Sequence, residues 1–224
     1  MKFEDKGFLI SKTKYNENSV IADFYTENNG KVTGLIFGAT SSKIKNFLFI
    51  GNNFNLQFNT KNNNRSGYFK VEIEKIFTPH YLDNKLKLNC ILYSMHLIKI
   101  LTVENQINKK IYKQFYNLFE ILNKDEWIKN YIFWELEVIK LVGYDINFNN
   151  YVDLNKINEN NSYVPTFDGS KEIPLFLLNK NKTEINKQEL KNGLKIVGDF
   201  LNKTILTPNN INYPLSRTEF IKLI

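Results

Sequence analysis

The segments FNLQF, residues 54–58, and FKVEI, residues 69–73, decide the first part of the fold. In each segment apolar and polar side chains alternate. Alternation with a period of two places all the apolar side chains on one face of a β-strand. In the first segment the side chains that are predicted to face a core are Phe54, Leu56 and Phe58.

Three earlier segments extend this pattern toward the start of the chain, and Asn/Gly-rich breaks separate them. They predict strands over Gly7–Thr13, Ser19–Thr26 and Lys31–Phe37. Five strands within residues 1–80, with no helical pattern between most of them, predict a small closed or nearly closed barrel.

Beyond residue 80 the apolar side chains follow helical spacing instead. The predicted helices cover Leu88–Ile98, Ile111–Leu122, Trp127–Leu141 and Gln188–Asn202, with a last helix near the C-terminal end. Asn123 is predicted to cap the third helix, which should end at Gly143. For the last helix we predict a capping box formed by Ser216 and Glu219.

The predicted fold class is therefore α+β, with a five-stranded barrel over residues 1–80 and a mostly helical domain over residues 81–224. Residues 144–173 lose the helical pattern and contain Pro165 and Gly169. We interpret them as an irregular excursion with a short hairpin around Tyr163–Phe167.

Composition and charge limit the possible classes of protein. The chain has 224 residues and a formal net charge of +7. Its apolar runs are far shorter than the roughly 18 residues that a membrane span needs, and its first residues lack the apolar core of a signal peptide. A single cysteine, Cys90, excludes an intramolecular disulfide and a Cys-rich zinc site. The expected compartment is the cytoplasm.

Motifs of catalysis are missing from the sequence. No stretch has the spacing of a nucleophile elbow or a phosphate-binding loop, and the only histidines are His80 and His96. Glu72 and Glu74 share a strand face, which a solvated outer surface explains better than a catalytic carboxylate pair. We therefore expect a protein that is not an enzyme and has no cofactor.

Positive charge is concentrated in one stretch. Residues 28–71 contain no Asp or Glu but carry six Lys or Arg side chains. A small barrel with such a face suits single-stranded nucleic acid, because cations neutralise phosphates and aromatic rings stack on bases. A generic Lys-rich surface stays an open alternative. The residues that are predicted to contact phosphate are Lys31, Lys43, Lys45, Lys61 and Arg65.

The order and spacing of several segments resemble the bacterial RecO family of recombination mediators. The opening segment is FEDKGFLISKTKYNENSVIADFYTENNGKVTGLIFGA, residues 3–39, followed by SSKIK, residues 41–45, and FLFIGNNFNLQF, residues 47–58. Later segments are WIKNYIFWELEVIKLVGYDINF, residues 127–148, then YVPTFDGS, residues 163–170, and YPLSRTEFI, residues 213–221.

The resemblance implies an N-terminal OB-fold and a C-terminal helical domain. RecO-like proteins bind single- and double-stranded DNA, anneal complementary strands and act at the nucleoid. They bind the acidic C-terminal tail of single-strand-binding protein, work with RecR and help to load RecA in the RecF pathway of gap and break repair. Many members hold zinc through cysteines after the Leu-Gly-Tyr stretch. Because Asn149–Asn161 has no cysteine, we expect no metal here.

A tail of that kind needs an apolar groove rimmed by cations. Lys129 and Arg217 are the candidates for partner binding, although Arg217 could instead pair with a nearby acid. Two other classes stay open from the residues alone. One is an OB-type RNA-binding or translation-associated factor, and the other is a nuclease with a dispersed carboxylate site.

Overall fold

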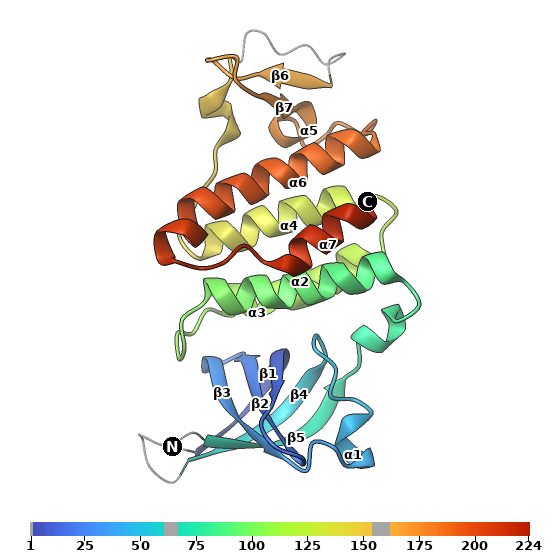
Figure 1. Cartoon of the computed structure of the whole chain (residues 1–224), viewed down its shortest axis with the longest axis vertical. Helices are drawn as coiled ribbons and strands as arrows, with labels where there is room; N and C mark the ends of the chain where they lie inside the picture. Colours follow the sequence, from blue (N-terminus) through green and yellow to red (C-terminus); the bar gives the residue numbers. More distant parts are fainter. Residues whose placement is uncertain (1, 61–66, 154–161) are drawn as a thin grey trace. The chain divides into compact units, whose positions relative to one another are not determined.

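The computed structural model describes residues 2–60, 67–153 and 162–224 (Figure 1). The chain divides into two compact units, Met1–Asn123 and Lys124–Ile224. The predicted domain boundary near residue 80 falls inside the first unit, which includes two helices as well as the barrel, and it stays a prediction. No helix among the described residues combines the length and the hydropathy that a membrane span requires.

Five strands form the start of the first unit. They are β1 (Lys2–Lys14), β2 (Ser19–Thr26), β3 (Gly30–Phe37), β4 (Asn53–Asn59) and β5 (Gly67–Lys75). They close in the order β1-β2-β3-β5-β4, with β4 returning to β1. The β3–β5 pair is parallel and the other pairs are antiparallel. A five-stranded Greek-key barrel of this kind is the OB-fold, as predicted.

Glycines allow the parallel pair to close the barrel. Gly34 on β3 lies opposite Gly67 on β5. A Cβ atom at Gly67 would lie 2.1 Å from the Phe58 ring, and one at Gly34 would lie 2.7 Å from the Phe69 ring. Both distances are shorter than any van der Waals contact, so aromatic rings of the core occupy the space that larger residues would need.

The barrel core confirms the predicted strand face. Phe54, Leu56 and Phe58 are all buried, and they pack with Phe24 of β2 and Phe69 of β5. Rings of the core meet edge-on or tilted, with centroids 4.9 Å apart for both Phe24–Phe69 and Phe58–Phe69. This is the geometry that aromatic pairs prefer.

Replacing Leu56 tests this core. Leu56→Ala is expected to lower the free energy of unfolding by about 2–5 kcal/mol, because it removes buried methyl groups and leaves a cavity. The measurement is chemical denaturation followed by circular dichroism. Gln57→Ala, at the exposed neighbouring position, is the control and should change the free energy by less than about 0.5 kcal/mol. Equal effects of the two variants would contradict the strand face.

Two long helices complete the first unit after a short 3-10 turn, η1 (Thr78–Tyr81). They are α2 (Lys85–Leu101) and α3 (Lys109–Leu122). Asn84 and Asn108 cap them by accepting backbone N–H groups. Helix α3 packs on the barrel through aromatic rings, and the Phe8 ring of β1 stacks on Phe115 with centroids 4.6 Å apart.

The second unit is mostly helical. Its helices are α4 (Trp127–Leu141), α5 (Leu175–Leu178), α6 (Lys187–Leu201) and α7 (Leu215–Leu223). Short turns are η2 (Phe148–Tyr151), η4 (Asn202–Leu206) and η5 (Thr207–Asn209). The predicted hairpin is present as β6 (Tyr163–Pro165) paired with β7 (Glu172–Pro174).

Two of the predicted caps are wrong. Helix α4 starts after Glu126 with no side-chain cap, and Asn123 instead ends α3. Helix α7 starts one residue before Ser216, with Pro214 at the N-cap, so Ser216 lies within the first turn. The end of α4 is as predicted, because Gly143 follows it with a positive φ of 103°.

Candidate nucleic-acid interface

The outer face of β2 is divided into a covered and an uncovered part. Near one end of the strand, the Tyr25 ring lies 5.6 Å from the Phe115 ring of α3 and is fully buried. Two residues earlier, Asp23 forms an ion pair with Lys99 of α2 at 2.7 Å. The helices therefore cover this face as far as Asp23.

The outer face of the neighbouring strand β3 is also covered at Lys31, by the C-terminal end of α2. The Lys31 ammonium donates to the carbonyl oxygens of Lys99, at 2.9 Å, and of Thr102. These are carbonyls at the C-terminal end of α2, where a positive charge stabilises the helix. Burial lowers the pKa of Lys31. The Lys31 ammonium therefore has acceptors within the fold, and its predicted contact with phosphate stays a prediction.

A polar cluster marks the edge of the covered area. Thr33 donates to Asp23 at 2.7 Å and to Glu104 at 2.8 Å. Burial alone would raise the pKa of Asp23, but hydrogen bonds from Lys99 and Thr33 outweigh it and hold the pKa below the ordinary 3.8. The ionised carboxylate thus stabilises the fold above about pH 4, and this contribution is lost as the pH falls through the lowered pKa.

Beyond this edge the strands expose apolar side chains. Ile21 on β2 is 38% exposed and Phe37 on β3 is 55% exposed. Leu35 pairs across to Ile21 on one side and to Tyr68 of β5 on the other. The Phe37 and Tyr68 rings lie 5.9 Å apart. We call these four side chains, Ile21, Leu35, Phe37 and Tyr68, the platform.

Exposed cations occur on the segment that follows β3, a few residues after Phe37. Lys43 and Lys45 project from α1 (Ser42–Lys45), and both are exposed. The segment before α1 is fixed to the β1–β2 turn, because Thr40 donates to the Asn18 side chain at 2.8 Å. Lys14, also exposed, precedes that turn.

Carboxylates lie at the borders of the platform. On β5, Lys70 follows Tyr68 on the same face, and acids begin only with Glu72 and Glu74. Glu74 is engaged by Lys6 at 2.5 Å. Two exposed acids lie four residues in sequence from a platform residue, Glu17 in the β1–β2 turn and Glu72 on β5. Charges of both signs therefore border the platform, with Lys70 on the same face of β5 as Tyr68 and Glu72.

Of the five predicted DNA-binding residues, Lys43 and Lys45 are exposed on α1, the short helix that follows β3. Lys31 is engaged at the end of α2, and Lys61 and Arg65 lie outside the described residues. Lys14 and Ile21 are not among the residues that were predicted from the sequence. Alternation along β3 could have separated Phe37 from the core, because Lys31, Thr33, Leu35 and Phe37 share one face.

The two predicted partner-binding residues have other partners in the structure. Arg217 of α7 is fully buried, and it pairs with the Glu135 carboxylate of α4 and donates to the Leu194 carbonyl of α6 at 2.6 Å. The alternative reading, an ion pair with an acid, is the observed one, although this acid lies on another helix. Lys129 is also buried and donates to the Lys182 carbonyl at 2.7 Å.

Arg217 is thus expected to stabilise the second unit. Arg217→Ala should lower the free energy of unfolding by about 3–5 kcal/mol, because it leaves the buried Glu135 charge without its cation. Denaturant titration measures this effect. Lys222→Ala, at an exposed site on α7, is the control and should have little effect. The double variant with Arg217→Met and Glu135→Leu should recover most of the loss. A soluble, equally stable Arg217→Ala protein would contradict this role.

The fold and the platform define a class of protein. An OB-type barrel that presents aromatic rings and exposed lysines is suited to oligonucleotides. Among the residues that the structure describes, no three His, Cys, Asp or Glu side chains gather in a way that could hold a metal ion.

Comparison with known proteins identifies the family. Residues 1–77 match the family model described as "Recombination protein O N terminal", and residues 84–209 match "Recombination protein O C terminal". The chain therefore belongs to the RecO family.

Relatives from several bacteria have nearly the same length. A protein of Ehrlichia chaffeensis is 27% identical over 244 residues, which span 100% of this chain and 98% of that protein. One of Rickettsia bellii is 27% identical over 238 residues, spanning 100% and 97%. One of Wolbachia sp. subsp. Drosophila simulans is 24% identical over 244 residues, spanning 100% of both. Each is named "DNA repair protein RecO".

Proposed function

We propose that this protein is a recombination mediator in the repair of DNA gaps and breaks. In this role it binds and anneals DNA strands and, together with RecR, helps RecA to load onto DNA that is coated by single-strand-binding protein. Membership of the RecO family and the names of its relatives support the role in DNA repair. The observation that carries the DNA-binding part is the uncovered platform with its exposed Phe37, followed on α1 by the exposed Lys43 and Lys45.

The platform suits annealing for a physical reason. Stacking on Phe37 and Tyr68 uses the flat face of a base, whereas base pairing uses the edge. Lys43 and Lys45 would hold the phosphates, which are the same for every sequence. A strand bound in this way keeps its pairing edges available to a complementary strand, and binding does not depend on sequence.

Charge and stacking do not distinguish DNA from RNA, since neither reads the 2′-hydroxyl group. The alternative of an OB-type RNA-binding factor is therefore an outcome of the binding test. A nuclease is the second alternative, and the magnesium arm of the annealing test distinguishes it from a mediator.

The phosphate contacts can be counted from salt dependence. The double variant Lys43→Glu and Lys45→Glu is expected to bind single-stranded DNA more weakly whatever its sequence. It should also reduce the slope of log affinity against log salt by about 1.4, since each phosphate contact contributes about 0.7. The control is Lys85→Glu with Lys109→Glu, which changes the charge equally at exposed sites on α2 and α3. If both variants shift the slope alike, the α1 segment is not the site.

Annealing tests the proposed function directly. The protein should accelerate pairing of labelled complementary oligonucleotides, also when single-strand-binding protein coats them, and should leave them uncut with or without magnesium. Phe37→Ala removes one stacking surface and should weaken strand binding by about 1–3 kcal/mol, with a matching loss of annealing. Leu82→Ala, at another exposed apolar position of the first unit, is the control. Cleavage that requires magnesium, or a clear preference for RNA, would contradict the proposal.

The first unit also has a groove that suits the tail of single-strand-binding protein. It has a volume of about 400 Å³ and is lined by rings of Phe77, Tyr81, Tyr116 and Phe119. Lys75 lies 5.0 Å from the Phe77 ring, and His80 lines the same groove, as does one acid, Glu120. Aromatic walls would hold the apolar end of the tail, and Lys75 would pair with its carboxylate. This groove replaces Arg217 and Lys129 as our candidate.

Titration with a labelled acidic tail peptide tests the groove. Lys75→Glu should weaken binding at least about fivefold, because hydrogen bonds to charged groups contribute roughly 1.5–3 kcal/mol. The same peptide with an amidated C-terminus should bind the unmodified protein about as weakly as the free-carboxylate peptide binds the Lys75→Glu variant. Lys85→Glu is the matched control. Equal affinities of the Lys75 and Lys85 variants would place the tail elsewhere.

A further inference from the structure

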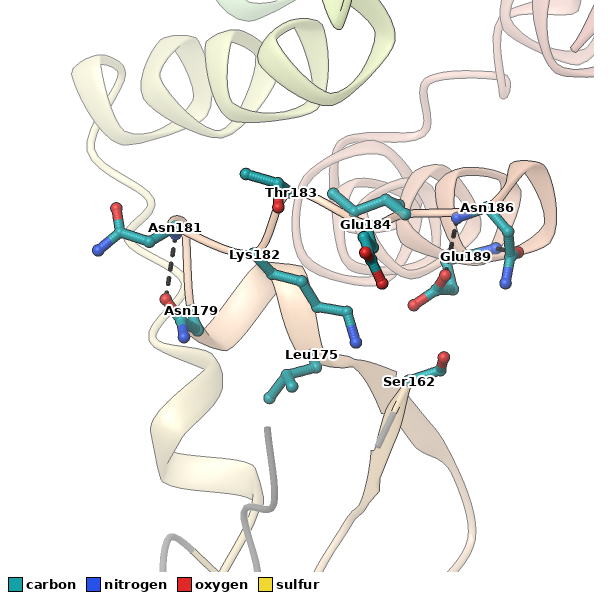
Figure 2. A pocket seen from close by; sticks show the side chains of 10 residues that line it. Ser162, Leu175, Asn179, Asn181, Lys182, Thr183, Glu184, Asn186 and Glu189 are labelled. Atoms are coloured by element: carbon teal, nitrogen blue, oxygen red, sulfur yellow. Dashed lines mark hydrogen bonds between the residues drawn. The ribbon is translucent and has the colours of Figure 1, made fainter. Parts of the chain in front are cut away.

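A cavity of about 800 Å³ lies in the second unit, and none of its lining residues belongs to the platform or to the aromatic groove (Figure 2). Its walls come from the end of the chain segment that leads into β6, from α5, from residues 179–186 and from the first turn of α6. The volume is within the range of about 300–1,000 Å³ that is usual for small-ligand sites. Its lining is largely polar, with Ser162, Asn179, Asn181, Lys182, Glu184 and Glu189 among its residues.

Glu189 is the unusual group in this lining. The residue is only 1% exposed, although it carries a carboxylate. One oxygen, Oε2, accepts the backbone N–H of Asn186 at 2.8 Å, and the Asn186 side chain in turn accepts the backbone N–H of Glu189 at 2.9 Å. This is a capping box, and it fixes the position of the carboxylate at the start of α6.

The second oxygen of the same carboxylate, Oε1, is buried and has no hydrogen-bond partner among the described residues. Figure 2 shows the Glu189 carboxylate directed toward the space between Lys182 and Ser162. Buried polar atoms nearly always have partners, because an unmade hydrogen bond in the interior is costly. A ligand in the cavity can supply the missing donor once the wall around this oxygen shifts enough to admit it.

The residues that line the cavity determine which kind of donor group a ligand should have. A carboxylate binds most strongly to a cation that carries N–H groups, such as a guanidinium or an ammonium. Glu184, exposed on the same wall, adds a second negative charge, against one positive charge from Lys182. Amide oxygens of Asn179 and Asn181 offer further acceptors. We infer that this cavity binds a cationic group with N–H donors, a guanidinium or an ammonium, through Glu189.

Such a cation could belong to a free small molecule or to a side chain of a polypeptide, and two probes separate these sources. Agmatine presents a free guanidinium, and N-acetyl-arginine amide presents an arginine side chain as a polypeptide does. Tetramethylammonium is the matched control, because it has the same charge as a guanidinium but no N–H group. The readout is the set of backbone amide shifts in ¹H–¹⁵N spectra of the full chain.

We expect agmatine or the arginine amide to shift the amide signals of residues 179–189, whereas tetramethylammonium leaves them in place. The probe that binds more tightly identifies the source of the cation. Shifts of equal size with tetramethylammonium, or no shifts with either N–H donor, would overturn the inference. This comparison uses the unmodified protein and does not depend on the folding of any variant.

A conservative substitution then tests Glu189 itself. In Glu189→Gln the amide oxygen can still accept the N–H of Asn186, so the capping box is kept, but an NH₂ group takes the place of Oε1. Binding should weaken at least about tenfold, since a charged hydrogen bond is replaced by two donors facing each other. Glu184→Gln removes the same charge from an exposed residue of the wall and should weaken binding less than threefold. Equal losses in the two variants would show that only general charge attraction is at work.

Discussion

The stacking of Phe8 on Phe115, with ring centroids 4.6 Å apart and planes 7° from parallel, is the contact on which the first unit depends. It joins β1 to α3 at the centre of an aromatic cluster that also contains Tyr25, Tyr112 and Phe119. A cluster of this kind buries a large apolar area and adds favourable ring geometry. Because it fixes α3 on one part of the barrel, it also determines which part of the outer face stays uncovered.

The roles of the lysines also differ between the covered and the uncovered part of the outer face. At the edge of the covered area Lys31 and Lys99 are used within the fold, one at the end of α2 and the other on Asp23. Lys43 and Lys45, which follow Phe37 on α1, are exposed. The same residue type therefore has two roles in one barrel, and the helices decide which lysines remain available to phosphate.

Local patterns were sufficient to predict most of the elements. Alternation located all five strands, and helical spacing located α2, α3, α4 and α6, because each pattern reflects one buried face. The cap of α4 was wrong because several polar residues precede that helix, and the cap of α7 was wrong because the helix already begins at Leu215, after Pro214. Contacts between residues far apart in the sequence could not be predicted from local patterns. Nothing local shows that Arg217 meets Glu135, 82 residues earlier, or that Lys31 meets the end of α2.

The central claim is that single-stranded DNA lies on the platform formed by β2, β3 and β5. Photo-crosslinking of a 5-iodouracil oligonucleotide, followed by mass spectrometry of the linked peptides, tests it most directly, because aromatic rings that stack on the modified base react preferentially. The account predicts links at Phe37 and Tyr68, both lost in excess unlabelled strand. Links confined to other aromatic residues, such as Tyr151 or Phe167 of the second unit, would contradict it.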